Sequence, residues 1–168
     1  MLLTLMTFVP LVGAVALLFV PKERPQTIRW IALGASLASF LLSLGVAATF
    51  EYGRPDMQMM TRLPWLPAIH VQYLIGIDGI SLPLLLLTTL LTLLCILYSW
   101  RIDLRVKEYF FMFLLLETGM LGVFIALDFF LFYVFWEISL VPMFFISKKP
   151  TSEGYKISFT FSQNALCQ

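Results

Sequence analysis

Two acidic residues inside strongly apolar sequence are the main chemical signal in this chain. Glu117 lies in YFFMFLLLETGMLGVF, and Glu137 lies in FFLFYVFWEISLVPMFF. An ionisable group at bilayer depth costs about 2.5–3.5 kcal/mol, so such residues usually serve transport or pair with a partner. We therefore predict that Glu137 belongs to a proton relay, with a weaker role for Glu117.

The two carboxyl groups are expected at similar depth. Asp128 marks the turn between their segments, eleven residues after Glu117 and nine before Glu137. At about 1.5 Å per helical residue, the groups lie roughly 16 and 14 Å from that turn. Both therefore fall near the middle of a hydrocarbon layer about 30 Å thick. Whether they face each other is left open by the sequence.

Residues near Glu137 could support it. Pro142 cannot donate to the carbonyl of Ile138, so water could bind that acceptor, although an ordinary helix kink is the alternative. Trp136 is assigned a supporting place, and its aromatic neighbours are more typical of lipid or core packing than of a quinone site. Asp78 and Asp128 sit at predicted helix starts, where capping is expected rather than transport.

Other kinds of site lack their signatures in the sequence. Cys95 and Cys167 lie far apart and His70 is the single histidine, a pattern that fits neither a metal site nor a disulfide framework. No CxxC pair and no Gly-rich phosphate loop occurs. We therefore predict no catalytic residue, cofactor-binding site or metal site, and the net charge of +1 predicts no nucleic-acid partner.

The composition predicts a membrane protein. Of 168 residues, 60% are hydrophobic and 12% are charged, with a mean hydropathy of +0.91. Soluble domains carry about 25% charged residues. Apolar stretches long enough to span a bilayer, which takes about 20 residues, cover 2–20, 28–50, 80–100, 109–127 and 129–146. The predicted fold is an all-α, polytopic transmembrane helix bundle of about five spans.

The connections between these stretches add three expectations. The first stretch lacks a basic N-terminal region and a good cleavage site, so a mature helix is expected rather than a signal peptide. Residues 51–79 are rich in proline and are expected to form a surface loop. Small residues on one face of the second stretch allow close helix packing; they are Ala32, Ser36, Ser39, Ser43 and Ala47.

Basic residues are distributed unevenly between alternate connections. Lipid-embedded chains keep basic loops on the cytoplasmic side. One set of connections holds Lys22, Arg24, Arg29, Arg101, Arg105, Lys107, Lys148, Lys149 and Lys156, and the other holds Arg54 and Arg62. We therefore predict an outside N-terminus and a cytoplasmic tail, in a bacterial plasma membrane. No Lys or Arg lies at the expected depth of the two carboxyl groups.

The sequence FFLFYVFWEISLVPMFFI, preceded by LLLETGMLGVFIALD, resembles the fourth and fifth helices of the chain M (subunit 4) family of proton-translocating NADH:quinone oxidoreductase. IGIDGISLPLLLLTTLLT is similar to the family's entry to its third helix. The resemblance covers about residues 1–146. It implies a non-catalytic membrane-arm subunit that moves protons while other subunits pass electrons from NADH to quinone.

The resemblance also implies partners and residue roles. The partners would be the lipid bilayer and other membrane-arm subunits, which would use NADH and quinone while this chain binds neither. Glu137 matches a transmembrane glutamate that pairs with a lysine on a later helix. Glu117 matches a second acidic position.

The chain departs from the family in its length. Family members are much longer, and their buried lysines lie beyond the matching part. Residues 147–168 turn polar and leave the family pattern. We expect this tail to be non-native, as a frameshift would produce, and the 168-residue chain to be inactive as a pump by itself.

Two other functions fit the same residues. A cation/proton antiporter subunit would use the same carboxyl chemistry for exchange. A structural or assembly subunit could dock on a neighbouring subunit through the small-residue face of its second helix. The ETGM and FWEISLVPM segments favour the oxidoreductase.

Overall fold

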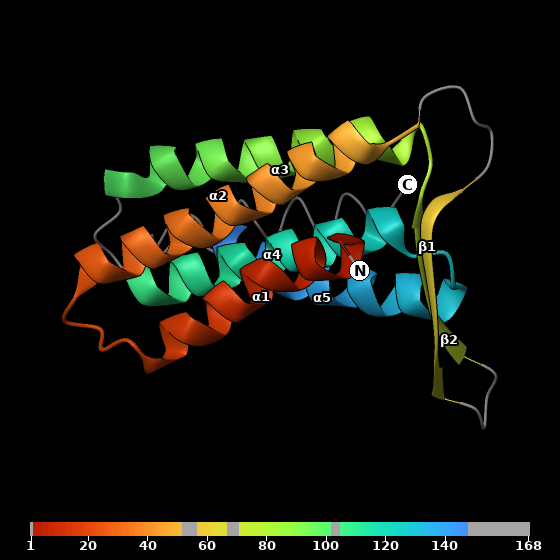
Figure 1. Cartoon of the computed structure of the whole chain (residues 1–168). Coiled ribbons are helices and arrows are strands. Elements are labelled where there is room, and N and C mark those ends of the chain that lie inside the picture. The colour runs from red at the N-terminus through yellow and green to blue at the C-terminus, as the bar shows by residue number, and fades with distance from the viewer. Residues whose placement is uncertain (1, 52–56, 67–70, 102–104, 148–168) are drawn as a thin grey trace, which may run out of the picture.

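Five long helices, running alternately up and down, make up most of the chain (Figure 1). The computed structural model describes residues 2–51, 57–66, 71–101 and 105–147, so His70, Cys167 and the tail from 148 lie outside the described residues. The helices are α1 (Leu2–Phe19), α2 (Pro25–Thr49), α3 (Ser81–Tyr98), α4 (Val106–Ile125) and α5 (Phe129–Ser147), with the short 3-10 helix η2 (Ser99–Arg101) after α3. All five are long and apolar enough to cross a membrane, which confirms the predicted all-α transmembrane fold.

The helix starts follow local capping chemistry. The Asp78 carboxylate accepts the backbone N–H of Ser81, the first residue of α3, at 2.7 Å. The Asp128 carboxylate accepts the backbone N–H of Phe130 in the first turn of α5 at 2.8 Å. The capping predictions for both aspartates are confirmed. Helix α2 begins at Pro25, before its apolar stretch, because proline is suited to the first helical turn.

The predicted surface loop over 51–79 was wrong in its main part. Strands β1 (Gln58–Leu66) and β2 (Val71–Ile77) form an antiparallel hairpin. Pro64 is tolerated opposite Gln72 because each strand of a two-stranded sheet keeps a free edge that needs no donor. The prediction was wrong because the proline content of this segment was taken to exclude strands.

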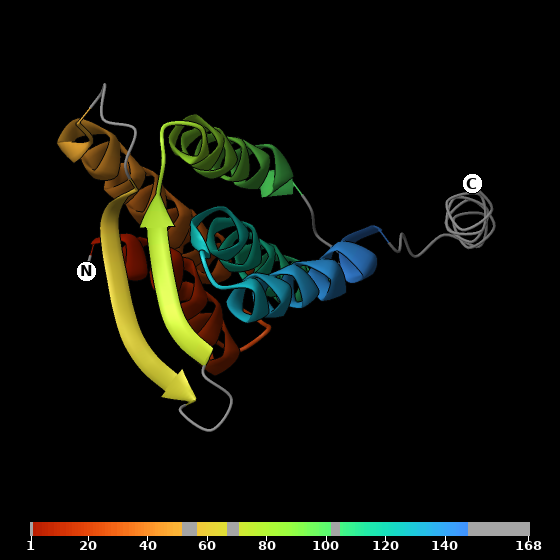
Figure 2. The same ribbon diagram turned by 90° about the vertical axis from the view of Figure 1, so that its right-hand side faces the viewer.

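The hairpin covers one end of the bundle (Figures 1 and 2). The backbone N–H of Leu127, in the α4–α5 connection, donates to the carbonyl of Leu74 at 3.0 Å. Ile75 and Ile77 are fully buried against the helix ends. The hairpin therefore fixes the ends of the helices that carry the two glutamates.

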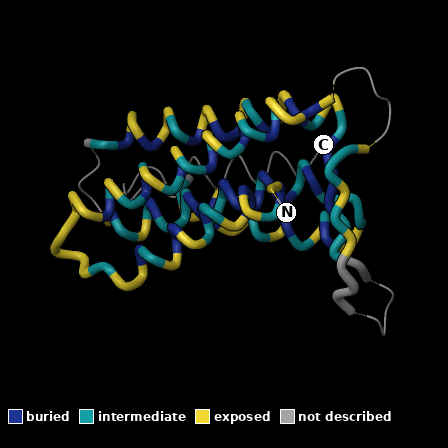
Figure 3. The backbone as a smooth tube through the Cα atoms, viewed as in Figure 1, coloured by how far each residue is buried: buried dark blue, intermediate teal, exposed yellow. Residues whose placement is uncertain are grey.

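The interior contains two apolar clusters, and the buried faces of the helices point inward (Figure 3). The hairpin-side cluster contains Leu3, Met6, Val46, Phe50, Ile75, Ile77, Leu82, Leu85, Leu121, Ile125, Leu131 and Phe135. The distal cluster contains Ala14, Leu17, Ile28, Ala32, Ile96, Val106, Phe110 and Leu114.

The small-residue face of α2 lies inside this bundle. Ala32, Ser36, Ser39 and Ser43 are fully buried, and α2 packs on α1, α3 and α4. The expectation that this face docks on another subunit was wrong, because helices of the same chain already cover it.

Basic side chains hold together the end of the bundle opposite the hairpin. The Lys107 ammonium donates to the carbonyls of Leu18 and Val20 at 2.9 and 2.8 Å. It thus meets the last carbonyls of α1, which carry partial negative charge. On the surface beside it, Lys22 and Glu108 form an ion pair at 3.5 Å.

Candidate functional site

Close contact between α4 and α5 sets the direction of both glutamates. A Cβ placed on Gly119 would lie 3.0 Å from the backbone nitrogen of Ser139 in α5. A Cβ placed on Gly122 would overlap the ring of Phe135. The two glycines therefore mark the face of α4 that meets α5, and Phe135 and Ser139 mark the facing side of α5.

Glu117 leaves α4 on the side away from α5. It precedes Gly119 by two residues, which is about 200° around a helix with 3.6 residues per turn. It shares a buried stripe with Leu114 and Leu121, which belong to the two apolar clusters. Its side chain is 1% exposed. Within the described part of the chain, neither carboxyl oxygen has a hydrogen-bond partner.

Glu137 leaves α5 on the side away from α4. It stands two residues from both Phe135 and Ser139, about 200° around the helix from each. It is exposed at the outer face of the bundle. Tyr133, one turn earlier on α5, is likewise exposed and lies on the same side of the helix. No Lys or Arg of the described segments forms an ion pair with it.

The two carboxyl groups thus sit on neighbouring helices but point to opposite sides of the α4–α5 contact. Glu117 faces the interior formed with α1, α2 and α3, and Glu137 faces outward. In this arrangement the two side chains do not exchange a proton directly.

The two supporting residues lie on different faces of α5. Pro142 is buried within the helix, which continues past it to Ser147. Trp136 is 47% exposed and stacks on Phe132 at a ring distance of 5.9 Å. Trp136 is therefore beside Glu137 on the outer surface, whereas Pro142 is on the inner one.

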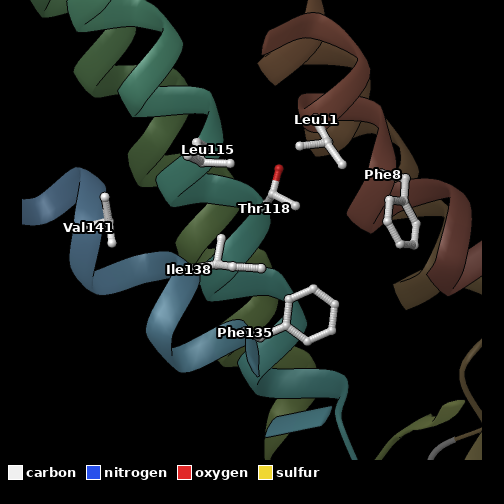
Figure 4. Close-up of a pocket in the computed structure, with 7 residues that line it drawn as sticks. All are labelled: Phe8, Leu11, Leu115, Thr118, Phe135, Ile138 and Val141. Atoms are coloured by element: carbon white, nitrogen blue, oxygen red, sulfur yellow. The ribbon is translucent and has the colours of Figure 1, made fainter. Parts of the chain in front are cut away.

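An apolar crevice lies between α1, α4 and α5 (Figure 4). It has a volume of about 270 Å³ and is lined by Phe8, Leu11, Leu115, Thr118, Phe135, Ile138 and Val141. The only polar side chain in this lining, Thr118, donates its hydroxyl to the carbonyl of Leu114 at 3.0 Å. The crevice therefore presents no titratable group.

Sequence reasoning missed two residues near the glutamates. Tyr133 is one helical turn before Glu137, a spacing that could have identified it. Ser39 was assigned to packing only, yet its buried hydroxyl has no hydrogen-bond partner among the described residues. In the same part of the chain, no group of three or more His, Cys, Asp or Glu side chains is placed to hold a metal ion.

Comparison with known proteins gives consistent relatives. The chain is 42% identical over 149 residues to NADH-quinone oxidoreductase subunit M of Rhodobacter capsulatus, covering 86% of this chain and 29% of that protein. It is 45% identical over 139 residues to NADH-ubiquinone oxidoreductase chain 4 of Arabidopsis thaliana, covering 82% and 28%. No family model matches the chain.

A solved structure agrees with these relatives. A chain of respiratory complex I from Thermus thermophilus superposes with a TM-score of 0.68 at 30% identity, covering 84% of this chain and 27% of that one. The chain spans less than a third of the length of the proteins it matches. Over the matched part it is homologous to subunit M, or chain 4, and the predicted resemblance is confirmed.

Proposed function

We propose, from this homology, that the chain is part of a proton-translocating membrane-arm subunit of NADH:quinone oxidoreductase. Its relatives are named for NADH and quinone. This chain would contribute proton-holding groups, while NADH and quinone react on other subunits. Its partners would be those subunits and the surrounding bilayer.

The position of Glu137 is the observation that supports this proposal. Transmembrane carboxylates almost always face protein or a water-filled cavity, because lipid cannot stabilise their charge. Glu137 lies instead on an outer face of α5, near the middle of the span. That face, which also carries the exposed Tyr133, is suited to a protein partner that covers it.

We infer that the partner supplies a cation, as in the resemblance to chain M, where a lysine on a later helix faces this position. A cation near Glu137 favours its ionised form, and withdrawal of the cation favours protonation. A group whose proton affinity depends on a movable charge can take up and release a proton in turn. Glu117 would be a second proton-holding group on a separate path.

The orientation proposed for the chain follows its charge distribution. The end of the bundle with Lys22 and Lys107 would face the cytoplasm, and the hairpin would face outside, in a bacterial plasma membrane.

The test is Glu137→Gln in the full-length subunit, assembled in its complex and reconstituted into liposomes. We expect the rate of NADH-driven proton uptake to fall about tenfold. This is the effect of losing a coupling free energy of about one to two kcal/mol between Glu137 and its partner. Assembly should be normal, since the side chain packs on no helix of this chain.

A matched control is Glu108→Gln. Glu108 lies in the first turn of α4, half exposed, in surface ion pairs with Lys22 and Arg105. Its substitution should leave proton uptake nearly unchanged. Equal proton uptake by the Glu137 variant and the wild type would refute the relay role.

A further inference from the structure

Buried polar residues lie between the two apolar clusters on four successive helices. On α2, for example, Ser36, Ser39 and Ser43 separate Ala32 of the distal cluster from Val46 of the hairpin-side cluster. The same order holds on the other three helices. This polar layer consists of Thr7 of α1, Ser36, Ser39 and Ser43 of α2, Thr88, Thr89 and Thr92 of α3, and Glu117 and Thr118 of α4.

Most of the polar layer is satisfied internally. Each of its hydroxyls except that of Ser39 lies within hydrogen-bonding distance of a carbonyl one turn earlier in its own helix. Ser43 and Thr89 also join α2 to α3 through a hydrogen bond of 3.0 Å. The exceptions in the layer, within the described residues, are the Ser39 hydroxyl and both carboxyl oxygens of Glu117.

These two groups lie at the same level of the bundle. A Cβ on Gly13 of α1 would meet Ala35 of α2 at 2.5 Å and Leu114 of α4 at 3.3 Å, so these residues share one level. Helices α2 and α4 run in the same direction (Figure 1). Ser39 is about 6 Å beyond Ala35 toward the hairpin, and Glu117 is about 4.5 Å beyond Leu114.

A third polar group is available on α1. Pro10 is buried in this helix, one turn from Gly13 toward the hairpin. Because proline has no N–H, the carbonyl of Met6 lacks its usual helical donor. By residue count Met6 lies about 10 Å beyond Gly13 toward the hairpin, so this freed acceptor is about one helical turn past the level of Ser39 and Glu117.

We propose that Glu117 and Ser39 form an internal water-binding site at the centre of the α1–α4 bundle. Their polar atoms are buried and have no hydrogen-bond partner among the described residues. They lie at the same level on the contacting helices α2 and α4, an arrangement that a bridging water would satisfy. Water bound in proteins typically has two to four polar partners. The two carboxyl oxygens of Glu117 and the Ser39 hydroxyl supply them.

The water site stands apart from Glu137, which faces the other way. Its presence does not depend on the function proposed above, but its use as a proton-holding site rests on that function. A water hydrogen-bonded to Glu117 provides the donor and acceptor that a carboxyl group needs to exchange its proton inside an otherwise apolar core.

The experiment is cryo-electron microscopy of the intact complex with the full-length subunit, at a resolution that shows ordered water. The wild type should show water density within hydrogen-bonding distance of both the Glu117 carboxyl group and the Ser39 hydroxyl. Ser39→Ala should lose or displace that density. Ser36→Ala is the matched control, because Ser36 is equally buried but already donates to Leu33, and it should keep the density.

Three results would overturn the proposal. The first is a dry wild-type site. The second is direct pairing of Glu117 with a protein group from another helix or subunit. The third is density that disappears when sodium is replaced by choline, since it would then belong to a cation.

The wild-type map decides the question even if a variant fails to assemble. Failure of the Glu137→Gln test would remove the relay role but leave the water density in place, so the two proposals can fail separately.

Discussion

At the scale of single residues, the Asp78 carboxylate secures the first turn of α3. Hydrogen bonds from the Ser81 hydroxyl and from the Ser81 backbone N–H lower the pKa of Asp78. A group with a lowered pKa stabilises the folded state above its unfolded pKa, and this stabilisation is lost as the pH falls through the folded value. The cap should therefore act at neutral pH and fade in acid.

Asp78→Ala should weaken this turn by about 1 kcal/mol at neutral pH, as expected for a lost cap. Amide hydrogen exchange at the start of α3 should become about fivefold faster. Asp78→Asn, which keeps an acceptor but loses the charge, should exchange at a rate between those of Asp78→Ala and the wild type. The difference between Asp78→Ala and the wild type should shrink in acid. A difference that persists unchanged at low pH would mean that the carboxylate charge has no part in the cap.

The same scale shows what the sequence could predict about the candidate site. Residue type and spacing predicted acidic groups at mid-depth, because those follow from chain distance alone. The direction of Glu117 and Glu137 was left open, since it depends on which residues of α4 and α5 meet. Gly119 and Gly122 carried that information, because small residues allow the closest approach of two helices.

At the scale of helices, the contact between α4 and α5 depends on the absence of a side chain at Gly122. Gly122→Ala would place a methyl group against the ring of Phe135. We expect a loss of about 1–3 kcal/mol in the free energy of unfolding, the usual range for overpacking. Thermal unfolding of the complex in lipid nanodiscs would measure it.

The matched control is Gly45→Ala in α2, where an added Cβ has no neighbour within 4 Å. This change should leave stability unchanged or raise it by up to about 1 kcal/mol, because alanine favours helix more than glycine does. Equal effects at the two glycines would contradict the close α4–α5 contact.

A second contact between helices joins the start of α4 to the end of α1 through Lys107. Lys107→Met removes the two hydrogen bonds to the carbonyls of Leu18 and Val20, and we expect a loss of about 1 kcal/mol. Lys22→Met breaks only a solvent-exposed ion pair and should cost less than about 0.5 kcal/mol. Unfolding in denaturant compares them, and a larger effect for Lys22 would reverse the assignment.

The elements were predictable to different degrees for physical reasons. Each helix carries its own signal, since a span must be apolar over about 20 residues. The hairpin is short, and its pairing is irregular, with register shifts between Gln58 and Thr61 and between Pro64 and Leu66. Burial of Ile75 and Ile77 against the helix ends stabilises it, and that contact does not appear in the local sequence.

At the scale of the whole molecule, the two ends of the helix bundle differ in structure and charge. Between them, the core consists of the hairpin-side apolar cluster, the polar layer and the distal apolar cluster. One end carries the hairpin, and the other carries the basic residues near the α1–α2 and α3–α4 connections. The polar layer lies between them, at the depth expected for Glu117. The orientation of the chain in the membrane therefore decides which end of the bundle faces the cytoplasm and which faces the outside.

Orientation can be measured with single cysteines in a background that lacks Cys95 and Cys167. Glu23→Cys lies at the basic end and Gly79→Cys lies beside the hairpin, and both positions are exposed. With a membrane-impermeant maleimide, we expect position 79 to react in right-side-out vesicles and position 23 to react in inside-out vesicles. The reason is that basic connections remain on the cytoplasmic side.

The reverse labelling pattern would place the hairpin in the cytoplasm and refute the orientation, but it would leave the fold and both carboxyl positions unchanged. Labelling of both cysteines in the same vesicle type would place positions 23 and 79 on one side of the membrane. A single helix, α2, lies between positions 23 and 79 and, if it spans the membrane, must place them on opposite sides. Such a result would therefore contradict the membrane-spanning assignment of α2 itself.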